Sequence, residues 1–120
     1  MVDSFTEAVI GAAFEVHNVL GFGYSEKVYE RALTVELEMR GVKFKTQQAT
    51  GVTYKGQPVG AFIADLVVEE CAIVELKTGT DLHQDHGKQC LNYLRAGGWK
   101  VGLVVNFGPR RVDVKRLIHS

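Results

Sequence analysis

Hydrophobic residues at helical spacing predict two helices at the start of the chain. Ser4 and Glu7 have the spacing of a capping box, in which two side chains satisfy backbone N–H groups of a first helical turn. The glycines at 21 and 23 end this helix. A second helix is expected from about residue 25 to about residue 40, with one side marked by Tyr29, Leu33 and Leu37.

The rest of the chain reads as extended segments with one more helix. Strands are expected at 42–46, 52–55, 59–68 and 71–77, with Glu69 and Glu70 in a tight hairpin between the last two. A helix at about 82–95 precedes a strand at 99–107, whose apolar centre suits burial on both faces, and a last strand near 112–118. The order α-α-β-β-β-β-α-β-β predicts an α/β fold, with a central mixed β-sheet flanked by α-helices.

Three charged residues occupy strand positions where hydrophobic residues are expected. Because side chains alternate along a strand, Asp65 should share a face with Ile63 and Val67. Glu75 and Lys77 should likewise share one face of the next strand, together with Ile73. Each charge would cost several kcal/mol among aliphatic neighbours without a partner. A divalent cation and a phosphodiester would supply such partners.

An acid followed on the next strand by an acid-x-lysine suits metal-assisted hydrolysis. The Asp65 and Glu75 carboxylates are hard ligands of the kind that Mg²⁺ or Mn²⁺ prefers, and the Leu76 carbonyl could add a third. Lys77 would face the attacking water or the developing negative charge. The alternative is a salt-bridged patch on a solvated sheet face. The aliphatic neighbours on both strands favour burial and hence the functional interpretation.

Two helices carry further candidates. Gln89 and Tyr93 are four residues apart on one helical face, with His86 one turn earlier, and could support the lysine or contact phosphate. Taken alone, this pattern favours an ordinary amphipathic helix, but directly after the acid-x-lysine strand it supports the functional interpretation. Glu26 and Glu30, near the start of the second helix, could complete a metal site, although a glutamate in a first turn usually complements the helix dipole.

Composition limits the remaining possibilities. The 120 residues suit a single domain spanning 1–120, and the 14 basic and 14 acidic side chains balance, so strong binding of nucleic acid by overall charge is not expected. Two cysteines form neither a disulfide framework nor a zinc motif, which fits a reducing, cytoplasmic location. The chain has no apolar run of membrane-spanning length and no signal-peptide pattern at its start.

Several motifs occur in the order that resembles the GxxExxY protein family. They are Gly23-x-x-Glu26-x-x-Tyr29, then Asp65, Glu75-Leu76-Lys77, Gln89-x-x-x-Tyr93 and Gly102-Leu103-Val104-Val105-Asn106-Phe107. That family is placed in the PD-(D/E)XK nuclease superfamily, and Ala64 stands where the superfamily name has proline. The resemblance implies a restriction-endonuclease-like core, with Asp65, Glu75 and Lys77 at the catalytic positions and Glu26 at the acidic position of the early helix. It also implies that Gln89 and Tyr93 match a supporting helix of exonuclease-like branches.

The sequence therefore predicts a nuclease that hydrolyses phosphodiester bonds, with DNA favoured over RNA as the substrate and with Mg²⁺ or Mn²⁺ as cofactor. Asp65, Glu75, Leu76 and Glu26 are the predicted metal ligands, and Asp65, Glu75, Lys77, Gln89 and Tyr93 the predicted catalytic residues. Cutting should be structure-directed or nonspecific, with a homodimer or partner protein supplying any specificity. The alternative is a catalytically inactive subunit that keeps the nuclease fold and binds nucleic acid or protein.

Overall fold

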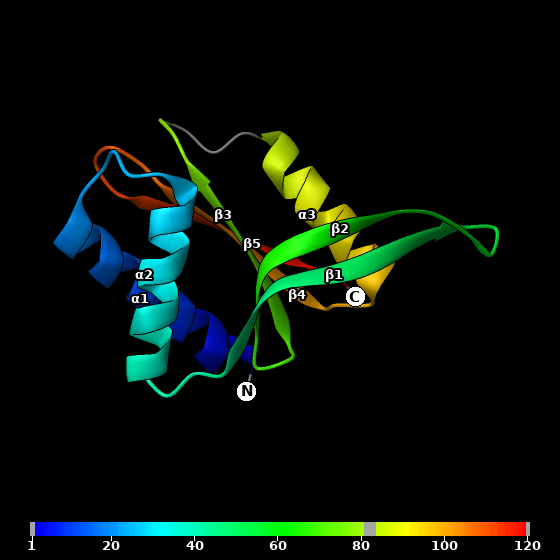
Figure 1. Cartoon of the computed structure of the whole chain (residues 1–120), viewed down its shortest axis with the longest axis horizontal. Helices are drawn as coiled ribbons and strands as arrows, with labels where there is room; N and C mark the ends of the chain where they lie inside the picture. The colour runs from blue at the N-terminus through cyan, green and yellow to red at the C-terminus, as the bar shows by residue number, and fades with distance from the viewer. Residues whose placement is uncertain (1, 81–83, 120) are drawn as a thin grey trace.

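The computed structural model describes residues 2–80 and 84–119, which form helices on both faces of one sheet (Figure 1). In chain order the elements are α1 (Val2–Leu20), α2 (Glu26–Met39), β1 (Phe44–Tyr54), β2 (Gln57–Val68), β3 (Ala72–Thr78), α3 (Gln84–Gly97), β4 (Val101–Phe107) and β5 (Val112–Ile118). The predicted α/β class is confirmed. No helix in the described residues is both long and apolar enough to cross a bilayer.

The five strands lie side by side in chain order. β3 and β4 are parallel because α3 carries the chain back between them, and the other neighbouring strands are antiparallel, so the sheet is mixed. Helices α1 and α2 pack on one face of the sheet, where they enclose the larger hydrophobic core. Helix α3 covers part of the other face, over a smaller core.

The larger core is anchored by α2. Tyr29, Leu33 and Leu37 are all fully buried, which confirms the predicted side of this helix. The Tyr29 ring stacks on Phe107 of β4 with 4.4 Å between centroids, and its hydroxyl donates to the Gly21 carbonyl. The predicted cap of the first helix is wrong, because α1 begins at Val2 and Ser4 lies inside its first turn.

The first two predicted strands form one continuous strand. Ten register pairs join β1 to β2, against three between β2 and β3, so the β1–β2 ribbon extends past the body of the sheet as an arm (Figure 1). Residues 47–51, between the two expected strands, are mostly polar, but cross-strand pairing along the arm keeps them extended. An irregularity remains at Gln47, whose φ is 52°.

The β2–β3 hairpin turns through two glutamates, as predicted. Glu69 and Glu70 have φ values of 51° and 56°, and the Cys71 N–H donates to the Val68 carbonyl at 2.9 Å. Two consecutive residues in the left-handed region fit a tight hairpin turn, although this conformation usually favours glycine or asparagine. The short turn places β2 and β3 in register immediately beside it.

Close approach of α3 to the sheet depends on Gly102 in β4. A Cβ at this position would lie 2.7 Å from the Cys90 sulfur of α3, 3.3 Å from Leu94 and 3.4 Å from Ile73. Real carbon and sulfur atoms do not pack this tightly, so any larger residue would push the helix away from β4. The glycine therefore sets the distance between α3 and the strands beneath it.

Replacing Gly102 with alanine is expected to destabilise the protein by about 1–3 kcal/mol, because the added methyl group overpacks the α3 interface. Urea unfolding measures this change. Gly51→Ala is the matched control, since a Cβ at Gly51 in β1 would meet nothing within 4 Å. Adding Cys90→Ala to the Gly102→Ala variant should recover part of the loss. Equal stability of Gly102→Ala and Gly51→Ala would contradict this account.

Candidate active site

The candidate site lies where β2 and β3 separate. Their ladder pairs Val68 with Ala72, Val67 with Ile73 and Leu66 with Val74, and then stops. The next opposed positions are Asp65 and Glu75. Beyond them, the Leu76 N–H has no β2 carbonyl to reach, and the Asp65 carboxylate accepts it instead at 2.7 Å. A buried backbone donor needs such a partner. Asp65 therefore lies where the ladder ends and satisfies the Leu76 N–H that the ladder leaves unpaired.

The simple alternation predicted for β2 is wrong at this point. Ile63 is 56% exposed, whereas Val67 is 3% exposed and belongs to the core beneath α3. Phe62 and Ala64 belong to that same core, so the inward-facing parity changes between Ala64 and Val67. The reason is that β2 changes partners here, from β3 in the sheet to β1 alone in the arm. Asp65 lies within this twisted stretch.

Glu75 is the most strongly perturbed group at the separation point. Its pKa is raised from 4.5 to about 8, chiefly because burial disfavours its charged form and next because the Asp65 carboxylate repels it. A hydrogen bond with Asp65 and the charge of Glu26 raise the pKa further, while Lys77 lowers it. Asp65, Glu75 and Lys77 thus interact at one place. Without a further cation, Glu75 is mostly protonated at neutral pH.

One side-chain oxygen of Glu75 has no hydrogen-bond partner among the residues that the structure describes. Its Oε1 is buried and accepts no hydrogen bond within the described part of the chain. An unsatisfied buried carboxyl oxygen is costly, and the neighbouring carboxylate increases the cost when both groups are charged. A bound cation would remove both penalties at once. The pair therefore fits a metal ion on the chemistry of its donors.

The number of side chains that could bind a metal ion here is small. Among residues 2–80 and 84–119, no three histidine, cysteine, aspartate or glutamate side chains are close enough to hold a metal together. Asp65 and Glu75 form a pair, with the Leu76 backbone between them and the exposed Glu26 further off. Mg²⁺ is commonly held by one or two carboxylates and keeps several waters, so a pair is compatible with it.

A pocket of about 290 Å³ opens beside Asp65 toward the start of α2. Its lining residues are Glu26, Lys27, Glu30, Gln47, Asp65 and Leu76. Ser25 caps the helix, since its hydroxyl accepts from the Val28 N–H at 3.4 Å, and this places Glu26 in the first turn. The pocket thus brings the predicted Glu26 to the same cavity as Asp65, as part of one wall.

Glu30 has a structural role, because its carboxylate is hydrogen-bonded within the fold. It is 7% exposed and accepts hydrogen bonds from Gln47 at 2.8 Å and from Lys27 at 3.3 Å. These contacts satisfy its carboxylate and tie α2 to β1 at the irregular Gln47. Neither Gln47 nor Lys27 is predicted as a site residue from the sequence. Only the left-handed backbone of Gln47, which the sequence does not display, singles that residue out.

The two predicted residues of helix α3, Tyr93 and Gln89, differ in their burial. Tyr93 is half-buried and stacks on Phe62 with 3.9 Å between ring centroids. The pKa of its hydroxyl is raised, first by burial and second by the charge of the nearby Glu75. Gln89 is exposed on the same helix. Between them Cys90 is buried, and burial raises the pKa of its thiol to about 12, so it is a packing residue. Tyr93 therefore borders the site, while Gln89 faces outward.

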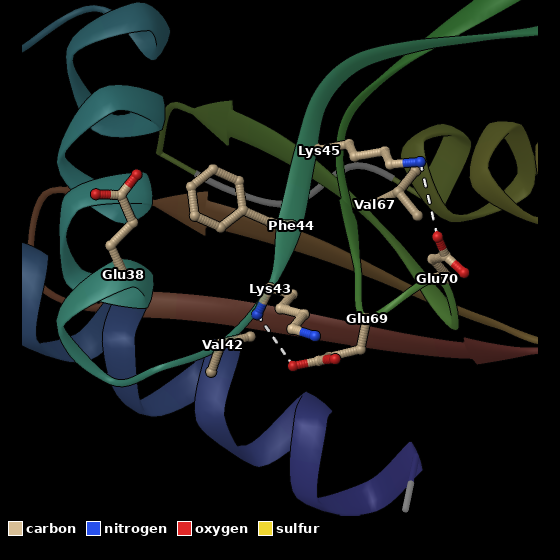
Figure 2. Close-up of a pocket in the computed structure, with 8 residues that line it drawn as sticks. All are labelled: Glu38, Val42, Lys43, Phe44, Lys45, Val67, Glu69 and Glu70. Atoms are coloured by element: carbon tan, nitrogen blue, oxygen red, sulfur yellow. Dashed lines mark hydrogen bonds and ion pairs between the residues drawn. The ribbon is translucent and has the colours of Figure 1, made fainter.

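A larger hollow of about 690 Å³ lies elsewhere, at the end of α2 and the β2–β3 hairpin (Figure 2). It contains none of the predicted site residues. Two of its acids have partners, since Glu69 accepts from the Lys43 backbone N–H at 3.0 Å and Glu70 lies 3.7 Å from Lys45. Size alone would favour this hollow. Glu75 lines neither cavity, but its unsatisfied oxygen beside Asp65 favours the point where β2 and β3 separate over this hollow as the candidate site.

The mixed sheet carries two acids and a lysine at the point where β2 and β3 separate. The chain belongs to the PD-(D/E)XK nuclease superfamily, whose family model matches residues 3–117. This membership agrees with the restriction-endonuclease-like core expected from the sequence.

Two solved structures share the fold. The crystal structure of SSO0001 matches with a TM-score of 0.63 and 18% identity, over 78% of this chain and 49% of that one. The alkaline exonuclease LHK-Exo from Laribacter hongkongensis matches with a TM-score of 0.50 and 14% identity, over 100% of this chain and 83% of the exonuclease. The chain thus spans about half the length of SSO0001. No curated protein sequence matches it significantly.

The raised pKa of Glu75 makes the metal-free protein less stable as the pH rises. The unfolded chain releases this proton near pH 4.5 and the folded chain near pH 8, so the folded state binds more protons between these values. In EDTA, Glu75→Gln should remove this loss and exceed the wild type in free energy of unfolding at pH 8 by on the order of a few kcal/mol.

Urea unfolding at pH 5 and pH 8 measures the effect. The control is Glu70→Gln, because the Glu70 side chain is 80% exposed and its substitution should leave the wild-type pH dependence in place. If Glu75→Gln retains the same pH dependence as the wild type, Glu75 is not the buried, neutral acid described above.

Proposed function

We propose that this protein is a metal-dependent nuclease that hydrolyses phosphodiester bonds, with DNA favoured over RNA as its substrate. The observation that carries the proposal is the buried, unsatisfied Glu75 Oε1 beside the Asp65 carboxylate. Membership of the PD-(D/E)XK nuclease superfamily supports the reaction class. The order of Gly23, Glu26 and Tyr29 before these acids further supports assignment to the GxxExxY group.

Each acidic group has a proposed role at the strand separation. Asp65 and Glu75 hold Mg²⁺ or Mn²⁺ with the Leu76 carbonyl, and Glu26 contributes from the pocket wall through bound water. Such a metal ion, when bound, polarises a phosphate oxygen and lowers the pKa of a coordinated water. Asp65 is already oriented by the Leu76 N–H, so holding its carboxylate at the site costs little further side-chain entropy.

Lys77 is the proposed catalytic cation. Its position two residues after Glu75 on β3 places both side chains on the face beneath α3, and its charge lowers the pKa of Glu75. From there the ammonium orients the attacking water and stabilises negative charge that develops on the phosphate. Tyr93, held by its stack on Phe62, borders the same face and contacts the substrate. Gln89 acts from the exposed side of α3, where a nucleic acid can reach it.

The substrate is expected to be recognised by shape more than by sequence. The chain has no net charge, so binding by phosphate contacts alone is weak and sensitive to salt. A small chain also leaves little surface for reading base edges. We therefore propose structure-directed or nonspecific cutting, with a second copy or a partner protein adding specificity where it is needed.

Glu75→Ala and Lys77→Met should each lower the rate of DNA cleavage by at least about 100-fold, because one loses a metal ligand and the other the catalytic cation. Linear, nicked and branched DNA should be tested with Mg²⁺ and with Mn²⁺. Glu70→Ala is the matched control, since its carboxylate is exposed and lines the other hollow. It should cut as the wild type does.

Two outcomes would contradict the proposal. If purified wild type cuts none of these DNAs with either metal, the chain is better described as a binding subunit with a nuclease fold. If Glu75→Ala retains the activity of Glu70→Ala, the cleavage arises from a contaminant or from another site.

A further inference from the structure

A polar row crosses three strands beneath α3. Lys77 of β3, Asn106 of β4 and Asp113 of β5 occupy adjacent register positions. Val105 and Phe107 pack into the core under α1 and α2, so Asn106 between them points to the opposite face. Lys77 points to that face as well, because its neighbour Leu76 belongs to the same larger core. The two side chains are therefore direct neighbours across the β3–β4 pair.

Asn106 is unusual for its position. It is 1% exposed in a strand whose other residues are glycine or hydrophobic. Its Nδ2 donates to the Gly79 carbonyl at 3.1 Å, which ties the chain that leaves β3 to β4. Its Oδ1, in contrast, is buried without a hydrogen-bond donor in the described part of the chain. An apolar residue would avoid that penalty, so the acceptor calls for a functional explanation.

Of the two residues that flank Asn106 in the row, Lys77 is the one that has a donor for Oδ1. Asp113, when ionised, has acceptor atoms and no donor, and it already pairs with Arg111 at 2.9 Å. The Lys77 ammonium carries three N–H donors and, within residues 2–80 and 84–119, forms no ion pair that would hold it elsewhere. Its flexible stem allows the ammonium to turn toward either β4 or Glu75.

We propose that Asn106 is a positioning residue for Lys77, whose ammonium donates to Asn106 Oδ1 while it faces the Asp65–Glu75 pair. This inference rests on the proposed nuclease function and extends it to the residue that aims the lysine. A neutral amide holds the ammonium without cancelling its charge, so the full positive charge remains available to the phosphate. A carboxylate in the same place would hold Lys77 but neutralise it.

The principal variant is Asn106→Leu, which has a similar volume and removes both polar atoms. It should lower kcat by about 10- to 100-fold with KM unchanged, because the lysine is misplaced while the binding surface stays intact. Mg²⁺ should raise the melting midpoint of this variant as much as that of the wild type, since no proposed ligand is altered. Combining it with Lys77→Met should lower kcat no further than Lys77→Met alone. Asn92→Leu, at an exposed asparagine of α3, is the control.

A second readout needs no catalysis. Lysine labelling by reductive methylation, quantified by mass spectrometry on folded, metal-free protein, reports how freely each ammonium is exposed. Lys77 should be labelled faster in Asn106→Leu than in the wild type, while the exposed Lys55 is unchanged. Asn106→Asp, which keeps the oxygen acceptor and is nearly isosteric, should label Lys77 no faster than the wild type but should also lower kcat.

The outcomes separate this inference from the proposed function. If Lys77 is labelled faster in Asn106→Leu but not in Asn106→Asp, the positioning role is supported even when wild type is inactive on DNA. Active wild type with unchanged kcat and unchanged Lys77 labelling in Asn106→Leu overturns the inference and leaves the nuclease proposal standing. Equally fast labelling in Asn106→Asp and Asn106→Leu also overturns it, because the bond to Gly79 would then explain the effect.

Discussion

The hydrogen bond from the Leu76 N–H to the Asp65 carboxylate is the interaction on which the site depends. It forms where β2 leaves β3 to pair with β1 alone, and it replaces the ladder bond that the separation removes. The same separation brings Asp65 opposite Glu75 without a backbone bridge between them. A strand that continued in register would close the gap. The arm and the candidate site are thus two results of one change of strand partner.

Electrostatic conflict distinguishes this site from an ordinary sheet interior. Asp65 and Glu75 lie together near Lys77, and burial leaves Glu75 protonated near neutral pH in the absence of a further cation. By contrast, Glu30 is buried but satisfied by Gln47 and Lys27, and it stabilises the packing of α2 on β1. The difference between these two glutamates is the unsatisfied oxygen of Glu75. Chemistry is expected where the fold tolerates such an atom.

Sequence pattern predicted the helices, the sheet class and the tight Glu69–Glu70 turn, because each depends on local spacing or on strong apolar runs. It failed for β1, where a polar run stays extended through pairing with β2, and for the facing of β2, where twist interrupts alternation. The interaction of Asp65, Glu75 and Lys77 could be anticipated from their strand positions. Gln47 and Asn106 could not, since the features that single them out are a left-handed backbone and an unpaired buried oxygen.

Proton release on metal binding tests the central claim most directly, because a cation that joins Asp65 and Glu75 must displace the proton that Glu75 retains. Calorimetric titration of metal-free protein with Mn²⁺ at pH 7, in buffers of different ionisation enthalpy, counts these protons. The account predicts release of close to one proton per bound ion, given a Glu75 pKa of about 8, and loss of both binding and release in Glu75→Gln. Binding without proton release, or equal binding by Glu75→Gln, would contradict it.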